Sequence, residues 1–257
     1  MKESGKIIKT IKIFSGDLSS VSKSSIKVIR EVILNVRVNG KPLANIACAG
    51  IHLEELVTGF LRSEKIIFRK EEIKKIEVHK NRVNVILKKN ENLPETSVKN
   101  IASSGARGRT HFDSLTPLNF PAGFKITTEI VLKLMDDLLN GSMIHNQTGG
   151  THCSALALKG QMTALREDIG RHNTIDMLAG YAVLKKIDLH KAFILTTGRI
   201  SSEIIYKVWN MGIPVIISHS APTANAVTLA RKANMALIGY VRKGKMNIYS
   251  QERRVII

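Results

Sequence analysis

The amino-acid sequence predicts an α/β protein: a layered sheet with helices on both faces, preceded by a small α+β unit. Two observations lead to this class. In the second half of the chain, apolar runs alternate with amphipathic stretches of about a dozen residues, as in crossover units. In the first half, β-branched runs flank tight-turn signals around a single helical pattern. A stretch rich in glycine, serine and arginine separates the halves, giving predicted domains over 1–115 and 116–257.

The first unit combines two hairpins and one helix. Asn-Gly between β-branched runs is typical of a two-residue hairpin turn, and apolar residues at helical spacing predict one buried helix face. A polar, serine-rich beginning is typical of an edge strand or a loose arm. The expected elements are that strand or arm over 1–24, a hairpin over 27–48 turning at Asn39-Gly40, a helix over 52–65, and a hairpin over 73–87 turning near Lys80-Asn81.

The second unit alternates regularly. We expect a helix over 127–142, a hairpin over 154–167 turning at Lys159-Gly160, a helix over 174–186, a strand over 192–198, a helix over 201–212, a strand over 213–218, a helix over 222–234, and strands over 236–241 and 246–250. In such sheets ligands bind outside the carboxyl ends of the strands. The loops after these strands are therefore the ones to examine for chemistry.

The net charge of +18 is the most unusual bulk property. It is explained either by a solvated lysine-rich surface or by an acidic partner such as nucleic acid or a polyphosphate ligand. Aromatic residues make up only 5% of the chain and the lysines are scattered, which argues against a dedicated nucleic-acid binder. No apolar stretch is long enough to span a bilayer and no secretory signal is evident, so we expect an intracellular, cytoplasmic protein without a membrane partner.

Four polar loops that carry glycine or proline fall at the predicted ligand-binding edge. Their adjacent glycines, arginines and helix starts suit an anion such as phosphate, and a basic turn around Gly244 suits a diphosphate. The alternative for each is structural: a Gly-Gly turn, mutual ion pairs, helix caps or a solvated turn. The candidate ligand-binding residues are Gly149, Gly150, His152, Asp168, Arg171, His172, Arg199, Ser220, Thr223, Arg242, Lys243, Gly244 and Lys245.

Metal and nucleophile signals are weak. The histidines and two cysteines match no zinc spacing, including that of the zinc deaminases, so we predict no catalytic metal. Cys153 follows His152, but neighbours on a strand point to opposite faces, and Cys48 lies in an apolar stretch typical of a core. We therefore assign no catalytic residue.

The loops together resemble one family. TGGTH, REDIGRHNTID, TGRISSE, GIPVIISHSAPT and GYVRKGKMNIY are similar to the FdhD/NarQ family of formate dehydrogenase accessory proteins, over about Val38 to Tyr249. The resemblance implies a cytidine-deaminase-like core without zinc, in a cytoplasmic homodimer. It also implies that Tyr240, Val241 and the basic turn as far as Lys245 lie at the cofactor-binding stretch.

The resemblance further implies a role in molybdenum cofactor biosynthesis. Family members are sulfurtransferases, or sulfur carriers, that take sulfur from a cysteine desulfurase and pass it to bis(molybdopterin guanine dinucleotide), which is then inserted into formate dehydrogenase or another molybdoenzyme apoprotein. That cofactor is the implied cargo here, and a GDP-like nucleotide is an implied occupant of the same site.

One departure concerns the sulfur-carrying loop itself. The family has C-G-x-C-G between its domains, whereas this chain has Ser104-Gly105-Ala106-Arg107-Gly108. A hydroxyl cannot hold transferable sulfur, because the chemistry needs a thiolate. Three hypotheses remain: cofactor binding and delivery without sulfur transfer, sulfur transfer through Cys153, or a basic nucleotide- or RNA-binding module on a deaminase-like scaffold. A smaller departure is Met177, where relatives usually have lysine.

Overall fold

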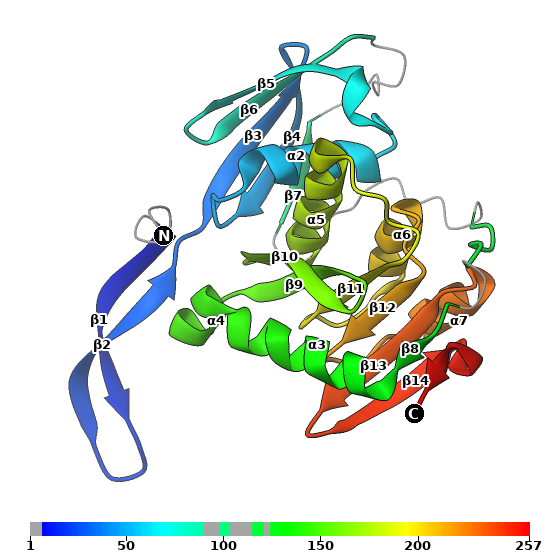
Figure 1. Cartoon of the computed structure of the whole chain (residues 1–257). Coiled ribbons are helices and arrows are strands. Elements are labelled where there is room, and N and C mark those ends of the chain that lie inside the picture. The colour runs from blue at the N-terminus through cyan, green and yellow to red at the C-terminus, as the bar shows by residue number, and fades with distance from the viewer. Residues whose placement is uncertain (1–6, 90–97, 103–114, 121–123) are drawn as a thin grey trace.

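The computed structural model describes residues 7–89, 98–102, 115–120 and 124–257, which form a projecting hairpin, an N-terminal unit and a C-terminal unit (Figure 1). The hairpin, which we call the arm, consists of β1 (Ile8–Gly16) and β2 (Val21–Ile29), paired antiparallel along their whole length. The expected edge strand or loose arm is thus one half of a regular hairpin. Its second strand continues to Ile29, into the segment that the sequence assigned to the next hairpin.

The N-terminal unit is a five-stranded sheet with strand order β5-β6-β3-β4-β7, covered by helix α2. Its elements are β3 (Val32–Val38), β4 (Lys41–Cys48), α2 (Leu53–Ser63), the 3₁₀ turn η1 (Lys70–Glu72), β5 (Ile73–His79), β6 (Arg82–Leu87) and β7 (Lys99–Ile101). Both expected hairpins are confirmed. Asn39 and Gly40 have φ of 49° and 80°, the left-handed conformation that the two-residue turn requires.

The C-terminal unit is a six-stranded sheet with strand order β10-β9-β11-β12-β13-β14, in which β11, β12 and β13 run parallel. Its elements are β8 (Ile126–Thr127), α3 (Thr128–Gly141), α4 (Met143–Thr148), β9 (His152–Leu158), β10 (Gln161–Asp168), α5 (Arg171–Lys185), β11 (Ala192–Thr196), α6 (Ser202–Asn210), β12 (Val215–Ser218), α7 (Ala224–Lys232), β13 (Ala236–Arg242), β14 (Lys245–Ser250), the 3₁₀ turn η3 (Glu252–Arg254) and β15 (Val255–Ile256).

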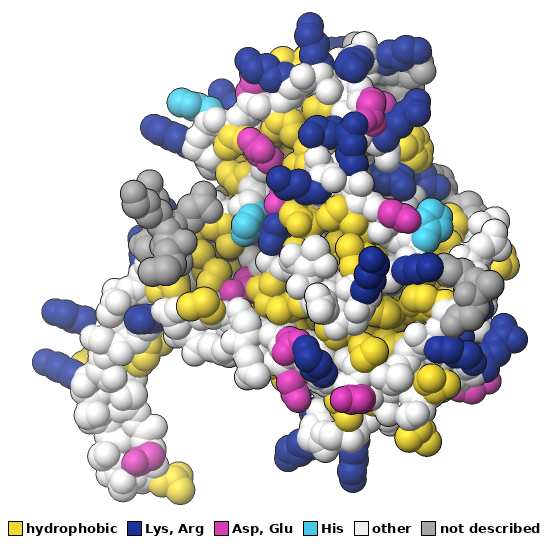
Figure 2. Space-filling view, viewed as in Figure 1, with side chains coloured by type: hydrophobic (Ala, Val, Ile, Leu, Met, Phe, Trp, Pro, Cys, Tyr) yellow, Lys and Arg dark blue, Asp and Glu magenta, His cyan; other side chains and the backbone are white. Residues whose placement is uncertain are grey.

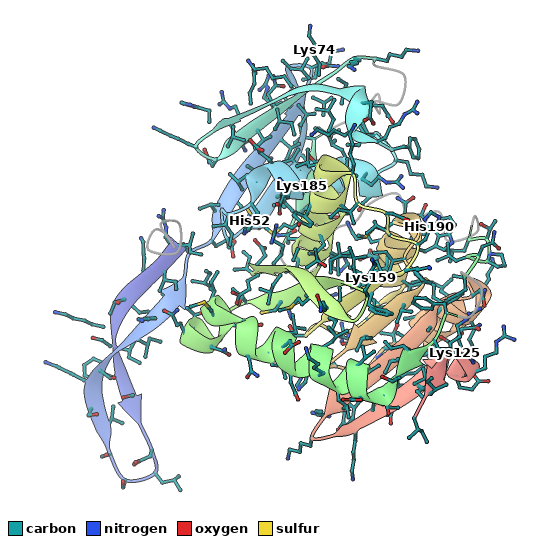
Figure 3. All side chains as sticks on the ribbon, in the orientation of Figure 1. His52, Lys74, Lys125, Lys159, Lys185 and His190 are labelled. Carbon is teal, nitrogen blue, oxygen red and sulfur yellow. The ribbon has the colours of Figure 1, made fainter. Side chains whose placement is uncertain are left out.

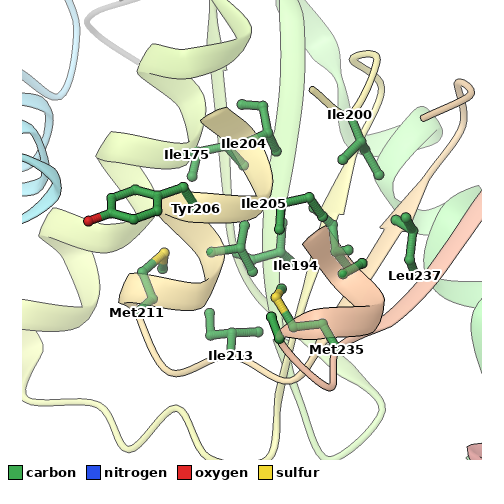
Figure 4. Close-up of a cluster of buried hydrophobic side chains, with 14 of the residues drawn as sticks. Ile175, Ile194, Ile200, Ile204, Ile205, Tyr206, Met211, Ile213, Met235 and Leu237 are labelled. Carbon is green, nitrogen blue, oxygen red and sulfur yellow. The ribbon is translucent and has the colours of Figure 1, made fainter. Parts of the chain in front are cut away.

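Helices cover both faces of this sheet, as the sequence predicted. On one face, side chains of α5, α6 and α7 pack with Leu156, Ile194 and Ile216 of the strands (Figure 4). On the other face, α3 packs on alternate strand residues such as Phe193 and Leu195. Each central strand is buried on both sides, which explains why these strands read as continuous apolar runs. Within the described residues, no helix is both long and apolar enough to cross a membrane.

The two units are joined through a close contact of α2 with α5. A Cβ atom added to Gly59 would lie 1.7 Å from the backbone oxygen of Asp176, and one added to Gly180 would lie 1.8 Å from that of Glu55. The helix backbones therefore touch where the two glycines meet. Met177 of α5 belongs to the hydrophobic core of the N-terminal unit, while Leu115 packs in that of the C-terminal unit. Arg166 adds a bidentate ion pair to Glu55 across the same interface.

Two of the four polar loops, expected over 146–152 and 166–173, are shorter than predicted. Asn146 to Thr148 belong to the short helix α4, so the expected glycine loop is only its end. Arg166 to Asp168 are the last residues of β10, and α5 begins at Arg171, so a loop of only two residues separates strand and helix. Apolar periodicity does not predict α4, because this helix contains no buried residue.

Candidate functional site: a cationic sheet edge

The strand register brings the predicted loops to one edge of the C-terminal sheet. His152 at the start of β9 lies opposite Asp168 at the end of β10. Thr196 at the end of β11 pairs with Ser218 at the end of β12. The backbone N–H of Tyr240 in β13 donates to the carbonyl of Ser220 at 3.0 Å. The carboxyl ends of the parallel strands thus meet where the rule for open α/β sheets places ligands.

The first group of side chains surrounds the starts of α5 and α6, and we call it the first cluster. A Cβ atom on Gly198 would lie 3.0 Å from Cβ of Arg171 and 3.5 Å from Nδ1 of His152, so both side chains pack against the backbone of the β11–α6 loop. The Nε2 atom of buried His172 lies 3.5 Å from a carboxylate oxygen of Glu203. The first cluster consists of His152, Arg171, His172, Arg199 and Glu203.

The cations of the first cluster repel one another. Burial lowers the pKa of Arg171, and Arg199 lowers it further. Burial and Arg171 also lower the pKa of His152. Burial, with smaller effects of Lys207 and Arg171, lowers the pKa of His172 to about 3. Glu203 offsets only part of this charge, because it is one carboxylate beside two arginines; burial raises its own pKa. The result is a positive potential that favours an anion.

Several buried polar atoms of this edge have no hydrogen-bond partner among the described residues. They are Nε of Arg171, both ring nitrogens of His172 and Oγ of Ser201. Ser201 occupies the N-cap position of α6 but makes no capping bond, whereas Thr223 caps α7 by accepting from the N–H of Ala226. Unmatched donors beside two helix starts are suited to an anionic ligand.

The second group lies around the end of β13, and we call it the second cluster: His219, Ser220, Tyr240 and Arg242. The guanidinium of Arg242 stacks 3.4 Å from the ring centroid of Tyr240, whose side chain is 44% exposed. Burial and then Arg242 lower the pKa of His219. This stacked, partly exposed surface suits a planar ring or a phosphate.

The other predicted residues of the closing strands divide by position. Lys243 and Gly244 form an exposed turn before Lys245, the first residue of β14, and Gly244 has φ of 69°. The side chain of Val241 is only 1% exposed and lies in the core, so this residue offers a ligand its backbone alone.

Besides Thr223, which caps α7, and the residues of the closing strands, three predicted residues belong to neither cluster. Asp168 is fully buried, and its carboxylate accepts from the N–H groups of Ala49 and Gly170 and from the amide of Asn173. These bonds tie β4 to the start of α5, so the contacts of Asp168 are structural. Gly149 and Gly150 end α4 beside the base of the arm, where a Cβ on Gly150 would lie 2.8 Å from Ile29.

The thiol of Cys153 has a structural environment. It is fully buried and donates to a carboxylate oxygen of Glu167 at 3.4 Å. Burial, with a smaller effect of Glu167, raises its pKa to about 12. Since the thiolate is the reactive form, this position does not favour sulfur transfer. No group of three His, Cys, Asp or Glu in the described part of the chain is arranged to hold a metal.

The predicted set of ligand-binding residues omits Glu203, Lys207 and His219. Glu203 and Lys207 are four residues apart in α6, a spacing that on most helices marks an exposed ion pair. Instead, Lys207 is 8% exposed and pairs with buried Asp176. His219 was the only histidine in its loop, which was the one available signal.

Replacing His172 by glutamine should flatten the acid side of the stability profile. The folded-state pKa of about 3 lies below the unfolded value of 6.5, so the contribution of neutral His172 is complete above pH 6.5 and lost toward pH 3. The wild type should lose up to about 1.4 kcal/mol per pH unit in this window relative to H172Q. Urea unfolding of both chains at several pH values measures this difference, in which other groups cancel. Parallel profiles would contradict the buried neutral state.

Comparison with known proteins identifies the fold and the family. A crystal structure of a putative formate dehydrogenase accessory protein from Desulfotalea psychrophila superposes with a TM-score of 0.80 at 22% identity, over 97% of this chain and all of the other. The model of the FdhD/NarQ family matches residues 29–256. The chain belongs to the FdhD/NarQ family.

Curated FdhD relatives cover nearly the whole chain. The sulfur carrier protein FdhD of Bacillus licheniformis is 36% identical over 260 aligned positions, spanning 98% of both chains. The protein of the same name from Staphylococcus haemolyticus is 36% identical over 88% of this chain and 89% of its own. The stretch from Ser104 to Gly108, which the sequence predicts to stand in place of the family's C-G-x-C-G loop, lies outside the described residues.

Proposed function

We propose that this chain is a formate dehydrogenase accessory protein that binds the molybdenum cofactor, as bis(molybdopterin guanine dinucleotide), and delivers it to formate dehydrogenase or another molybdoenzyme apoprotein. One observation carries the proposal: two cationic clusters, the first with unmatched donors, share one sheet edge in a member of the FdhD/NarQ family. An anionic dinucleotide matches this edge in charge and in its separate phosphate and ring contacts.

Each cluster has a distinct part in the proposal. Arg171, Arg199 and the free N–H groups at the start of α6 bind phosphate, and the unmatched donor of Ser201 adds to them. Tyr240 and Arg242 bind a guanine or pterin ring, with the turn at Lys243 to Lys245 beside a second phosphate. The fold proposed for this scaffold is a zinc-free, cytidine-deaminase-like core, and the assembly is a cytoplasmic homodimer.

Sulfur transfer is not part of the proposed activity. The two aligned cysteine positions hold Ser104 and Arg107, and Cys153 is buried with a raised pKa. The chain therefore holds and presents cofactor, and any cysteine desulfurase acts elsewhere. Incubation with a desulfurase and cysteine, followed by mass spectrometry, should show no added sulfur on Cys153. A persulfide on that residue would refute this part of the proposal.

Titration calorimetry with GDP tests the binding site. Arg199→Ala and Arg242→Ala remove one cation from each cluster, and each should weaken GDP binding roughly tenfold or more, as expected for charge-assisted hydrogen bonds. Lys133→Ala, at an exposed position of α3, is the matched control and should bind like the wild type. No GDP binding, or tighter binding of RNA that survives in the arginine variants, would contradict the proposal.

A further inference from the structure

The arm has two chemically different faces. Residues paired across an antiparallel ladder share a face of the hairpin. Ile11 pairs with Ile26, and two residues along, on the same face, Lys9 pairs with Val28. This face therefore carries four aliphatic side chains, Ile11, Ile13, Ile26 and Val28. The opposite face carries Lys12, Lys23 and Lys27, with the exposed side chains of Phe14 and Val21 toward the tip of the hairpin. We call the first the apolar face and the second the lysine face.

Within the described chain, nothing covers the outer part of the apolar face. Ile11 is 41% exposed and Ile26 is 43% exposed. The arm joins the body at its base, where Ile8 and Ile29 pack in a small apolar cluster and Lys27 donates to Gln147 of α4. The rest projects from the molecule (Figures 1 and 2). A two-stranded hairpin is only marginally stable alone in water, so this arm needs a partner surface.

The same chain carries a surface of the matching kind. A hollow of about 330 Å³ lies between the end of β4, the start of α2 and the end of β5. Its lining includes the apolar residues Ile51, Leu53 and Val78, and its rim carries the exposed carboxylate of Glu54. Figure 3 places His52, another lining residue, on the body side of the arm base, while the arm extends the opposite way. A chain therefore does not fill its own hollow.

We propose that the arm is exchanged between two copies of this chain, its apolar face packing on the hollow of a second copy and its Lys9 meeting Glu54 there. Lys9 is the cation on the apolar face, so packing of Ile11 and Ile26 brings its charge to the acidic rim. The hollow adjoins the base of the arm through Ile51, which packs in the same small cluster as Ile29. A two-fold axis beside the bases therefore forms the contact twice.

Beyond Lys27, which donates to α4 of its own chain, this assignment leaves the lysine face directed outward. The positive charges of two arms stay apart, and each contact contains the four aliphatic side chains, Ser24 and one ion pair. The inference rests on the homodimer of the proposed function and specifies the element that forms it. It does not depend on nucleotide binding, which takes place at the sheet edge of the C-terminal unit.

Sedimentation equilibrium of the full chain over a wide concentration range tests the proposal. The wild type should have about twice the monomer mass of 28.4 kDa. The double variant Ile11→Lys, Ile26→Glu removes the apolar contact yet keeps an attractive cross-strand pair, so the hairpin itself persists. Its dimer dissociation constant should rise roughly tenfold or more, since two buried isoleucines are lost per contact. Ser25→Glu, opposite Lys12 on the lysine face, is the matched control and should leave the dimer intact.

Charge reversal tests the register of the contact. Lys9→Glu and Glu54→Lys should each weaken the dimer, and the two together should restore it, because the pair is then re-formed with opposite signs. A wild-type chain that stays monomeric, a dimer that survives the Ile11/Ile26 change, or single reversals that do not compensate would each overturn the proposal. GDP titration of the same variants distinguishes this failure from failure of the cofactor site, because the arm variants should bind GDP normally.

Discussion

Alanine at Gly59 or Gly180 is expected to destabilise the chain by about 3 kcal/mol or more, at the upper end for overpacked sites. Each new methyl group would meet a backbone carbonyl at 1.7 or 1.8 Å, and a backbone cannot rotate away as a side chain can. The two helices must separate, which loosens the packing of Leu56, Phe60 and Met177 between the units. For a chain of this size the melting temperature should fall by roughly 6 to 12 °C.

Thermal and urea unfolding of G59A and G180A measure this effect, and Gly141→Ala is the matched control. Gly141 ends α3, and its added Cβ would meet only the ends of the Leu165 and Met162 side chains, at 3.1 and 3.6 Å. Alanine there should change stability by less than about 1 kcal/mol, the size of its helix-propensity advantage. Equal stabilities for all three variants would show that α2 and α5 are not in backbone contact.

Replacing Lys207 by methionine is expected to cost about 3–5 kcal/mol, the range for breaking a buried ion pair from one side. Both oxygens of the fully buried Asp176 carboxylate accept from Lys207, at 2.6 and 2.7 Å. After the change Ser63 remains the one hydrogen-bond donor to that carboxylate among the described residues. The charge would then be left uncompensated between the two units.

The double variant Asp176→Leu, Lys207→Met separates charge burial from packing. It should recover most of the loss, because apolar residues of similar volume often replace a buried pair at little cost. Lys133→Met removes an exposed pair with Asp137 and should be neutral within about 1 kcal/mol. Chemical unfolding of the four chains gives the comparison. If the double variant were no more stable than K207M, the stability loss of K207M would not come from the uncompensated charge of Asp176.

Local signals account for the parts of the fold that the sequence predicted. Asn39-Gly40 and Lys159-Gly160 both adopt positive φ, and each closes the expected hairpin. The parallel pairing of β3 with β6 and the length of β2 depend on contacts between distant segments, which periodicity does not encode. The helix α4 was not predicted for a related reason: it contains no buried residue, so its sequence has no apolar periodicity.

The sequence predicted the location of the candidate site better than it predicted the contacts of each residue there. Topology alone puts the ends of β11, β12 and β13 at one edge, so Arg199, Ser220 and Arg242 were identified by position. Whether each remaining residue can contact a ligand depends on how deeply its side chain is buried, and the sequence does not give this burial. Asp168 is of a residue type that often binds ligands, but it accepts three hydrogen bonds from the protein. Lys207 has the sequence spacing of a surface residue but is buried.

The glycine contact between α2 and α5 also constrains how the chain folds during synthesis. The N-terminal unit leaves the ribosome first, yet its core includes Met177 and its helix must rest on Gly180, more than a hundred residues later in the sequence. Such long-range contacts are slow to form, and until then the apolar side of α2 around Leu56 and Phe60 is open. The nascent chain therefore exposes an aggregation-prone surface until α5 has been made.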